Sequence, residues 1–506
     1  MKQKNLLHSL ICVFTISILG LFACETTEPS LGNENTTINN DLSGVDNDDD
    51  LVENSTFSTI VEIVYNSSSV EVTVTPLSDN GVTVSVSGTD VIVNSTTKEV
   101  EYIISGQASG SLKLYSDYKT KVTLNGLLLT NYIGPAINIQ CKKTSFIVLE
   151  GDNTLTDASG YATENNNEDQ KACFFSEGQL VFSGNGNLTI NGNSHHALAS
   201  DDYIRIISGS VMIMGNSGDA IHTNDAFIMS GGSVAIRSQD EGVACDEGYI
   251  YINGGSISIT TTGTSAKGIK AAGQIIINDG IVNVITSASE SEGIESKGDM
   301  TINGGTIEVT AYDDCINVGN NTSSLSINGG YIYCKSTTND GIDSNGSIAI
   351  TGGVIVSIGA KTPEEGFDCD QNTFSITGGC FVGLGGSTSN PTESSCTQYN
   401  VIFNGSQNTT LNLSSSDGTQ VLNLNIPSIG YTPTILFSSS ELSESTTYII
   451  KTGGTISGGT EWHGLYFNAT YSGGIGTSTT QASLGGNSNI NTPGGEIPGG
   501  NPGGMW

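Results

Sequence analysis

Acidic residues recur at one position of a repeated pattern between His195 and Ser389. The copies include SGDAIHT, QDEGVAC, ESEGIES, YDDCINV, TNDGIDS and PEEGFDC, and the residue before the small one returns every 22 to 26 residues. That residue falls at His196, Asp219, Glu241, Lys267, Glu292, Asp314, Asp340 and Glu365. Carboxylate oxygens are hard donors that suit calcium, so the repeat predicts a series of candidate metal ligands.

A second carboxylate follows the first by three residues in several copies, at Glu295, Asp343 and Asp368. If the copies stack at the strand spacing of about 4.8 Å, two neighbouring charges repel by about 0.9 kcal/mol in water. Such acids must either splay into solvent in polar turns or be bridged by cations. Calcium is the expected cofactor. The predicted ligands are Asp219, Glu241, Glu292, Glu295, Asp314, Asp340, Asp343, Glu365 and Asp368.

The interval between copies and the alternation within them predict the elements that position these residues. A repeat of this length is typical of a solenoid, in which each copy forms one coil stacked on the next. Apolar and polar residues alternate in Ile307, Glu308 and Val309, which is the period of a strand. Paired glycines such as Gly304 and Gly305 interrupt each coil at one point, where a sharp turn is needed. The sequence therefore predicts an all-β parallel β-helix with β-rich caps.

The ends of the chain predict export and membrane attachment. Lys2 and Lys4 precede an apolar stretch, and the motif LFAC ending at Cys24 is typical of the lipobox of bacterial lipoproteins. We expect Cys24 to be lipidated and the protein to lie outside the cytoplasm, at the outer membrane or cell surface. The predicted segments are a lipoprotein signal peptide (1–23), a disordered tether (24–56), a β-rich N-terminal cap (57–110), the parallel β-helix (111–398), a β-rich C-terminal cap (399–471) and a Gly-rich flexible tail (472–506).

Composition restricts the partners. The chain has 51 acidic and 17 basic residues, a formal charge of −34, which argues against nucleic-acid binding. An acidic polymer would need cations to screen or bridge it. Cys245 and Cys369 occupy the same position five coils apart, about 24 Å at strand spacing, so they cannot form a disulfide. We expect a monomer in which the cysteines pack as small apolar residues.

Aromatic and basic residues between the acidic copies allow two further roles. Tyrosine rings can stack on sugar faces, although tyrosine is also a common strand residue. The candidate carbohydrate-binding tyrosines are Tyr249, Tyr251, Tyr312 and Tyr331. Lys267 and Lys270 are the candidates for the base of a uronate lyase, but flanking carboxylates favour their charged form and a charge-balancing role. The DDCI and NDGID stretches partly match the motifs of polygalacturonases, in reversed order and without the GHG and RIK motifs.

Several stretches together resemble one bacterial family. They include EYIISGQASGSLKLY, KVTLNGLLLTNYIGPAINIQ, EGDNTLTDAS, ACFFSEGQLVFSGNGNLTINGN and the late LFSSSEL and YIIKTGG, and they cover about 100–454. The family is that of secreted calcium- and carbohydrate-binding parallel β-helix proteins, often lipoproteins, with a polysaccharide-lyase-like fold. The resemblance implies a right-handed β-helix, calcium held by acidic turns, and binding of cellulose or polygalacturonate. The chain departs from the pattern at His196 and Lys267.

Taken together, these features predict a lipid-anchored, calcium-dependent protein that binds a plant-type polysaccharide. No catalytic activity is firmly attached to the family, so an enzyme is the less favoured interpretation. A pectate-lyase-like or polygalacturonase-like enzyme stays open as an alternative, as does a structural surface stalk or adhesin.

Overall fold

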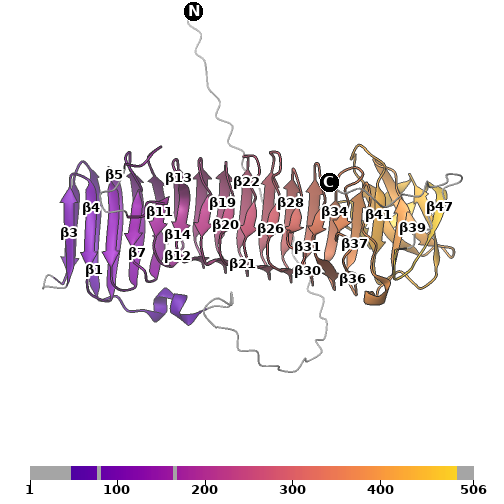
Figure 1. The fold of residues 1–506 in the computed structure, drawn as a ribbon, viewed down its shortest axis with the longest axis horizontal. Coiled ribbons are helices and arrows are strands. Elements are labelled where there is room, and N and C mark those ends of the chain that lie inside the picture. Colours follow the sequence, from indigo (N-terminus) through magenta and orange to yellow (C-terminus); the bar gives the residue numbers. More distant parts are fainter. Residues whose placement is uncertain (1–46, 77–80, 163–167, 487–506) are drawn as a thin grey trace, which may run out of the picture. The chain divides into compact units, whose positions relative to one another are not determined.

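Three ladders of strands form the body of the protein. A computed structural model of the chain describes residues 47–76, 81–162 and 168–486. Along the chain, a strand in a 13-stranded sheet is followed by one strand in each of two ladders of a 26-stranded sheet. Each such unit is one coil of a parallel β-solenoid of about 12 turns, which Figure 1 shows as strands stacked side by side. The prediction of an all-β parallel β-helix is confirmed.

The 13-stranded sheet supplies the first strand of each coil. It contains β3 (Val82–Ser87), β4 (Asp90–Ser95), β6 (Ser111–Ser116), β8 (Ile137–Gln140), β11 (Ala172–Ser176), β14 (His196–Ser200), β17 (Ile221–Thr223), β20 (Val243–Cys245), β23 (Ile269–Ala271), β26 (Ile294–Ser296), β29 (Ile316–Val318), β32 (Ile342–Ser344) and β35 (Phe367–Asp368). All neighbours pair in parallel except β3 and β4, which form an antiparallel pair at one end.

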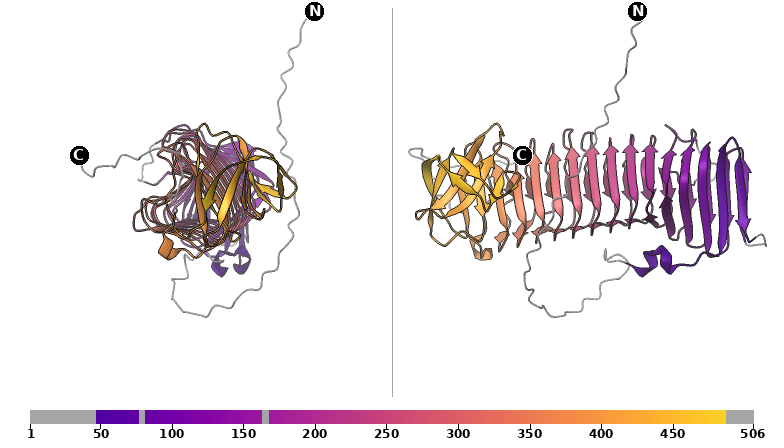
Figure 2. Two further views of the ribbon diagram at one scale, coloured as in Figure 1. Left: turned by 90° about the vertical axis from the view of Figure 1, so that its right-hand side faces the viewer. Right: turned by 180° about the vertical axis from the view of Figure 1, so that it is seen from behind.

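The 26-stranded sheet supplies the other two strands of each coil. The first ladder contains β9 (Ser145–Glu150), β12 (Leu180–Gly184), β15 (Tyr203–Ile206), β18 (Ala226–Met229), β21 (Tyr249–Ile252), β24 (Ile275–Ile277), β27 (Met300–Ile302), β30 (Ser324–Ile327), β33 (Ser347–Ile350) and β36 (Phe374–Ile376). The second ladder contains β10 (Asp152–Thr156), β13 (Asn187–Gly192), β16 (Ser210–Gly215), β19 (Ser233–Ser238), β22 (Ser256–Thr261), β25 (Ile281–Thr286), β28 (Thr306–Ala311), β31 (Tyr331–Ser336), β34 (Val354–Ile358) and β37 (Cys380–Gly385). The end-on view of Figure 2 shows successive coils overlying one another.

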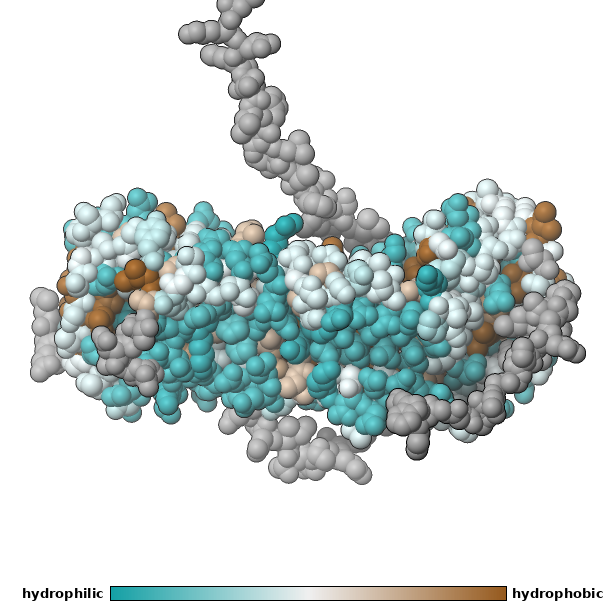
Figure 3. All heavy atoms as spheres, turned by 45° about the horizontal axis from the view of Figure 1, so that its top comes forward, coloured by the Kyte–Doolittle hydropathy of each residue, from teal (hydrophilic) through white to brown (hydrophobic). Residues whose placement is uncertain are grey.

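Alternation along each strand builds the core. In the second ladder, Val282, Ile307, Ile332 and Ile355 occupy paired positions of successive strands, and all four are fully buried. Their sequence neighbours point outward, because successive side chains of a strand alternate between its two faces. The core is therefore a set of apolar columns that continues from coil to coil. Figure 3 shows the complementary result, since hydrophilic residues cover most of the face in view.

A hydrogen-bonded asparagine ladder marks the turn between the two ladders. The side-chain amide of Asn303 donates to Asn278 Oδ1 at 2.7 Å, and that of Asn328 donates to Asn303 Oδ1 at 2.8 Å. The glycines that follow keep this turn tight. Gly305 has φ +87°, and a Cβ there would lie 2.8 Å from the Gly280 carbonyl oxygen, so a larger residue would collide with the adjacent coil.

Antiparallel strands close both ends. At the start, β1 (Thr59–Ser67) pairs with β2 (Val70–Thr75), while β5 (Val100–Ser109) and β7 (Thr120–Thr130) continue the stack in parallel. At the other end, β41 (Thr434–Ser438) pairs antiparallel with both β37 and β38 (Asn400–Asn404). The remaining cap strands are β39 (Thr409–Ser415), β40 (Gln420–Ile426), β42 (Thr447–Thr452), β43 (Thr455–Ser457), β44 (Thr460–Trp462), β45 (Leu465–Phe467), β46 (Thr470–Ser472) and β47 (Ile475–Gln481).

The segment boundaries differ from those predicted. The parallel stack begins at β1, within the predicted cap 57–110. Residues 47–56 of the predicted tether carry the 3-10 helices η1 (Asp48–Asp50) and η2 (Val52–Asn54), and Asp50 is buried. At the C-terminus β47 extends into the predicted tail. Asp50 attaches the first of these ends through its ion pair with Arg205, whereas the second is attached by the pairing of β47 with β42 and by the buried Ala482. A third 3-10 helix, η3 (Glu393–Ser395), precedes the C-terminal cap.

The predicted signal peptide and Cys24 lie outside the described residues. Among the residues that are described, no helix is long and apolar enough to cross a membrane. Eight cysteines are described and all are free thiols. Seven of them are buried: Cys141, Cys173, Cys245, Cys315, Cys334, Cys369 and Cys396. They pack as the sequence predicted.

We predict that Ile307→Ala destabilises the fold by about 2–5 kcal/mol, because it opens a cavity in a continuous apolar column. Ile281→Ala, on the adjacent strand, is the matched control, since Ile281 is 47% exposed. Its loss should stay below about 1 kcal/mol. Denaturant unfolding followed by circular dichroism measures both values, and equal losses would contradict the proposed core.

Candidate functional site

A column of outward-facing side chains runs along the 13-stranded sheet. Asn317 shows the geometry: it lies between Ile316 and Val318, which are fully buried in the core, so its own side chain faces the other way. The strand register pairs Asn317 with the equivalent residue of each neighbouring coil. We call this set the strand column: His222, Ala244, Lys270, Glu295, Asn317, Asp343 and Asp368.

A second column lies in the turns that lead into the same strands, three residues earlier in each coil. The N–H of Gly268 donates to the Glu292 carbonyl at 3.1 Å, and the N–H of Gly293 donates to the Asp314 carbonyl at 2.8 Å. Adjacent members therefore lie about one strand spacing apart. We call this set the turn column: His196, Asp219, Glu241, Lys267, Glu292, Asp314, Asp340 and Glu365. The two columns together contain all nine predicted ligands.

Three aspartates converge near the C-terminal end of the columns. Asp340 lies in the turn column, and Asp343 and Asp368 are paired in the strand column. One carboxylate oxygen of each lies within 4.8 Å of the others, which is close enough for a single cation to contact all three. Asp340 is 6% exposed. The aspartates come from the coils that enter β32 and β35.

Backbone hydrogen bonds hold the turn-column carboxylates in place. The N–H of Asp340 donates to Asp314 Oδ1 at 2.8 Å, and the N–H of Glu365 donates to Asp340 Oδ1. Ser389 Oγ donates to Asp368 Oδ1 at 3.1 Å. One oxygen of Asp314, of Asp340 and of Asp368 is thus held by a hydrogen bond from the protein.

Burial makes four carboxyl groups of the two columns weak acids. It raises the pKa of Asp314 to about 9 and that of Asp340 to about 8, from an ordinary value of 3.8, and nearby carboxylates add to the effect. Burial likewise raises the pKa of Asp343 and of Glu365 to about 7. Within the described part of the chain, no Lys or Arg forms an ion pair with any of these four. With no protein cation beside them among the described residues, these buried carboxyl groups favour the protonated, neutral form.

Three buried acceptor oxygens in the columns lack a hydrogen-bond donor. They are Glu292 Oε2, Asn317 Oδ1 and Glu365 Oε2. Asn317 is only 8% exposed, so its carbonyl oxygen is largely removed from water. Leaving such a group without a partner costs about 1–3 kcal/mol. A cation bound in the column would satisfy an oxygen of this kind. The sequence pattern of carboxylates does not include Asn317, although its offset from Asp314 matches that of Asp343 from Asp340.

Lysines neutralise the middle of the columns. Lys267 Nζ lies 3.2 Å from Glu292 Oε1, Lys270 Nζ lies 3.2 Å from Glu241 Oε1, and Lys297 pairs with Glu295. Burial acts to lower the pKa of Lys270, but the Glu241 carboxylate outweighs it and the pKa is raised. A raised pKa is unfavourable for a neutral catalytic base.

Histidines occupy the N-terminal end. His222 Nδ1 lies 2.8 Å from Asp219 Oδ2, and the His196 and His222 rings stack with their centroids 4.1 Å apart. Burial lowers the pKa of His196 to about 3, and its Nδ1 accepts the N–H of Asp219 at 3.1 Å. Beside them, the interaction of Asp240 with the Glu241 carboxyl group, together with burial, raises the pKa of Asp240 to about 7. Nitrogen donors set this end apart from the all-oxygen C-terminal end.

The four candidate tyrosines do not converge on one surface. Tyr249 and Tyr251 lie on β21 of the first ladder with their rings 5.7 Å apart, and Tyr251 is largely buried. Tyr312 lies in the turn after β28, and Tyr331 lies on β31 of the second ladder, 49% exposed. The Tyr331 ring contacts that of Trp462, with 5.4 Å between the centroids. The cap thus adds a ring that the repeats alone do not predict.

Comparison with known proteins adds a family. The model of the family described as "Carbohydrate-binding domain-containing protein" matches residues 78–341 and 287–457. A protein of the same description from Acetivibrio thermocellus is 30% identical over 97 residues, which are 19% of this chain and 34% of that protein. The match thus spans about a third of the relative. The solved structure of a polysaccharide lyase-like protein from C. thermocellum, a gadolinium derivative, aligns with a TM-score of 0.41 and 23% identity over 48% of this chain and 96% of the other.

We predict that, in a chelator, stability falls as pH rises from about 4 to about 9. The folded chain keeps protons on Asp314 and Asp340 that the unfolded chain releases near its ordinary pKa of 3.8, so rising pH favours unfolding. Melting temperatures measured between pH 5 and 8.5 should decline less for Asp314→Asn/Asp340→Asn than for the wild type. A control, Glu441→Gln/Glu444→Gln, removes two exposed acids of the cap and should follow the wild type. Equal slopes for all three proteins would contradict the prediction.

Proposed function

The chain belongs to the family of carbohydrate-binding domain-containing proteins, and from this premise we propose that it binds a carbohydrate polymer with the help of bound calcium. The observation that carries the calcium part is the convergence of Asp340, Asp343 and Asp368. Calcium accepts six to eight oxygen ligands in flexible geometry, and every donor at this end of the columns is an oxygen. The donor set therefore fits the ion.

Charge supports calcium at this end rather than along the whole length. Glu241, Glu292 and Glu295 already have lysine partners, and Asp219 contacts histidine. Asp314, Asp340, Asp343 and Glu365 have raised pKa values and no such partner in the described part of the chain, so a divalent cation would relieve both the repulsion and the cost of burial. Asp340, Asp343 and Asp368 would hold the ion. Asn317 Oδ1, Asp314 and Glu365 are the neighbouring donors that could extend the site.

The carbohydrate would lie along the exposed face of the solenoid. Equivalent groups repeat at the strand spacing of about 4.8 Å, and a polymer presents equivalent groups to such a surface at regular intervals. A calcium ion with ligand positions open to solvent can bind sugar hydroxyl or carboxylate oxygens directly. Cellulose and polygalacturonate are the substrates that the sequence resemblance suggested, and they are retained here as proposals.

Binding is favoured over catalysis. A uronate lyase needs a base near the reacting carbon, and the two candidates, Lys267 and Lys270, are both held in ion pairs. Inverting hydrolysis needs one protonated and one charged carboxyl group with space for water between them. The convergent aspartates lie much closer than that arrangement requires, with oxygens within 4.8 Å.

We further propose that the protein is a lipoprotein attached through Cys24, facing the outside of the cell. The signal-like N-terminus and the LFAC motif support this proposal. Radiolabelled fatty acid should be incorporated into the wild type and lost with Cys24→Ser.

We predict that calcium raises the melting temperature of the wild type and that Asp340→Asn/Asp343→Asn removes this increment. Calcium at a hundredfold excess over its Kd should add about 2.7 kcal/mol. Without calcium the variant should be at least as stable as the wild type, because it loses buried repulsion. Calorimetric titration and thermal melting measure both effects. Glu441→Gln/Glu444→Gln is the charge-matched control and should keep the calcium response.

A pull-down on insoluble polysaccharide tests carbohydrate binding. The wild type should be retained on an insoluble polysaccharide in calcium and released by chelator, whereas Asp340→Asn/Asp343→Asn should show weak retention in both conditions. A protein that binds calcium normally yet is retained by no polysaccharide would fit a structural stalk and would contradict the proposed function.

A further inference from the structure

A basic pocket lies near the start of the solenoid, in a chain that is otherwise strongly acidic. Its volume is about 590 Å³, and four of the seventeen Lys and Arg residues of the chain line it, against two acids. The lysines are Lys98, Lys119, Lys142 and Lys143. Screening at physiological salt limits the reach of charge to about 8 Å, so the local excess of positive charge decides what this pocket attracts.

Strand pairing places the lysines together. The register aligns Val100, Thr120 and Ser145 at the starts of β5, β7 and β9. The residues one step earlier are Glu99, Lys119 and Thr144, and those two steps earlier are Lys98, Tyr118 and Lys143. The pocket is therefore built by three successive turns, each about 4.8 Å from the next. These turns lead out of the 13-stranded sheet, whereas the turn column leads into it.

Three of the four pocket lysines have no carboxylate partner among the residues that the structure describes. In the described part of the protein, no carboxylate oxygen lies within 4.0 Å of the ammonium groups of Lys98, Lys119 or Lys143. Lys142 reaches only Glu177, at 3.8 Å, with its side chain 84% exposed. By contrast Lys113, Lys121, Lys171, Lys267, Lys270 and Lys297 are all ion-paired. With three acids for every basic residue, unpaired lysines gathered in one pocket are available to an external anion.

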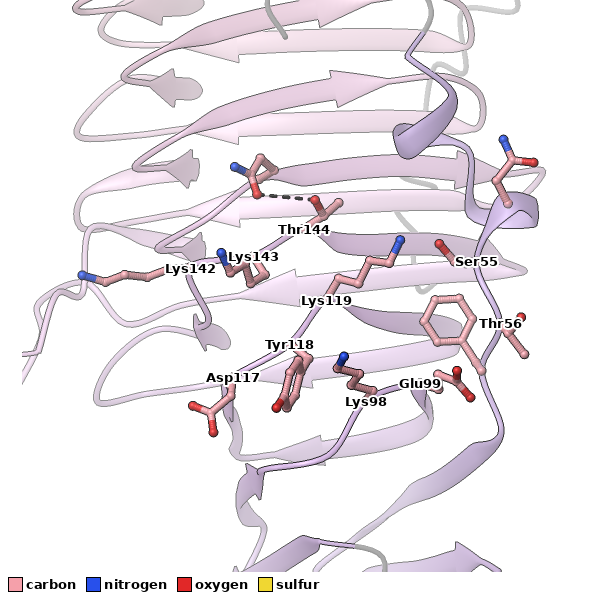
Figure 4. A pocket seen from close by; sticks show the side chains of 13 residues that line it. Ser55, Thr56, Lys98, Glu99, Asp117, Tyr118, Lys119, Lys142, Lys143 and Thr144 are labelled. Atoms are coloured by element: carbon pink, nitrogen blue, oxygen red, sulfur yellow. Dashed lines mark hydrogen bonds between the residues drawn. The ribbon is translucent and has the colours of Figure 1, made fainter.

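Aromatic rings give the pocket apolar surface. Lys98 Nζ lies 5.3 Å from the centroid of the Tyr118 ring, and Phe57 also lines the pocket. Figure 4 shows Lys119 reaching toward Ser55, and Lys98 directed toward the Tyr118 ring. Rings beside charged donors are the usual composition of a site for a ligand with both apolar faces and polar substituents.

A buried ion pair fixes one wall of the pocket. Residues 54–57 form this wall, and the preceding Asp50 is 3% exposed. Asp50 Oδ2 lies 2.7 Å from Arg205 Nη1 on β15, and the Tyr203 hydroxyl donates to Asp50 Oδ1. The N–H groups of Ser58 and Thr59 donate to the Glu99 carbonyl at 2.9 and 3.0 Å. The wall is therefore part of the folded solenoid.

We infer that this pocket binds the anionic group of an acidic saccharide, with Lys98, Lys119 and Lys143 contacting a carboxylate or sulfate and Tyr118 or Phe57 contacting the sugar ring. The inference rests on the proposed function and names a ligand class for it. The acidic columns repel such a sugar unless calcium bridges it. The basic pocket attracts the same sugar without a metal. The columns therefore need calcium to bind an acidic sugar, whereas the pocket does not.

Titration calorimetry in chelator tests the pocket. The full chain should bind trigalacturonate, and its methyl ester, which has the same sugar and no charge, should bind at least tenfold more weakly. Lys119→Gln/Lys143→Gln should weaken trigalacturonate about tenfold, a loss of about 1.4 kcal/mol. Lys361→Gln/Lys451→Gln makes the same change of charge away from the pocket and should leave the affinity unchanged. A sulfated trisaccharide, titrated in parallel, shows whether the pocket accepts a carboxylate or a sulfate. Lys119→Gln/Lys143→Gln should weaken the binding of whichever of the two saccharides the wild type binds.

Equal affinity in the two double variants would overturn the inference, as would equal binding of the acid and its ester. Trigalacturonate binding that needs calcium and ignores Lys119→Gln/Lys143→Gln would overturn it while leaving the calcium proposal intact. Conversely, normal behaviour of the pocket with no retention on any insoluble polysaccharide would contradict the proposed function alone.

Discussion

Parallel pairing of equivalent strands is the constraint on which the rest of the structure depends. It places the same position of every coil in a column with a spacing of about 4.8 Å, whatever residue stands there. Apolar residues at such positions make a continuous core, as Val282, Ile307 and Ile332 do. Amides make the asparagine ladder, in which each side chain both donates and accepts. Ionised carboxylates cannot form such a ladder, because they accept hydrogen bonds but cannot donate them to one another.

The acidic columns therefore cost free energy, and the chain offsets that cost differently along its length. Lysines from the same or a neighbouring coil pair with Glu241, Glu292 and Glu295 in the middle. Histidines accompany Asp219 at the N-terminal end. At Asp340 and Asp343 the cost is met by protonation, since burial raises both pKa values to near or above neutrality. A group held in this state releases its proton when a cation binds, which links metal affinity to pH.

The same stacking explains why the positive charge is concentrated as well. Turns that leave the 13-stranded sheet carry lysines in consecutive coils, and of the four only Lys142 has a carboxylate partner among the described residues, the Glu177 side chain at 3.8 Å. The N-terminal segment completes the pocket by docking through Asp50 onto Arg205. Opposite charges are thereby separated onto different turns of one solenoid, so a polysaccharide with both hydroxyl and acidic groups can contact two chemically distinct surfaces.

The sequence by itself determined the solenoid and the existence of its acidic columns. Period and alternation are local properties, and with a period near 24 residues they bring Asp314, Asp340 and Glu365 into adjacent coils. Only the tertiary structure decided which carboxylates have a cation: Lys270 pairs with Glu241 of the preceding coil, a choice that depends on side-chain direction. It also placed Asn317 in the strand column, His222 against His196, and Asp50 on Arg205, 155 residues away in sequence. These contacts depend on turn geometry and coil register, which a local pattern does not encode.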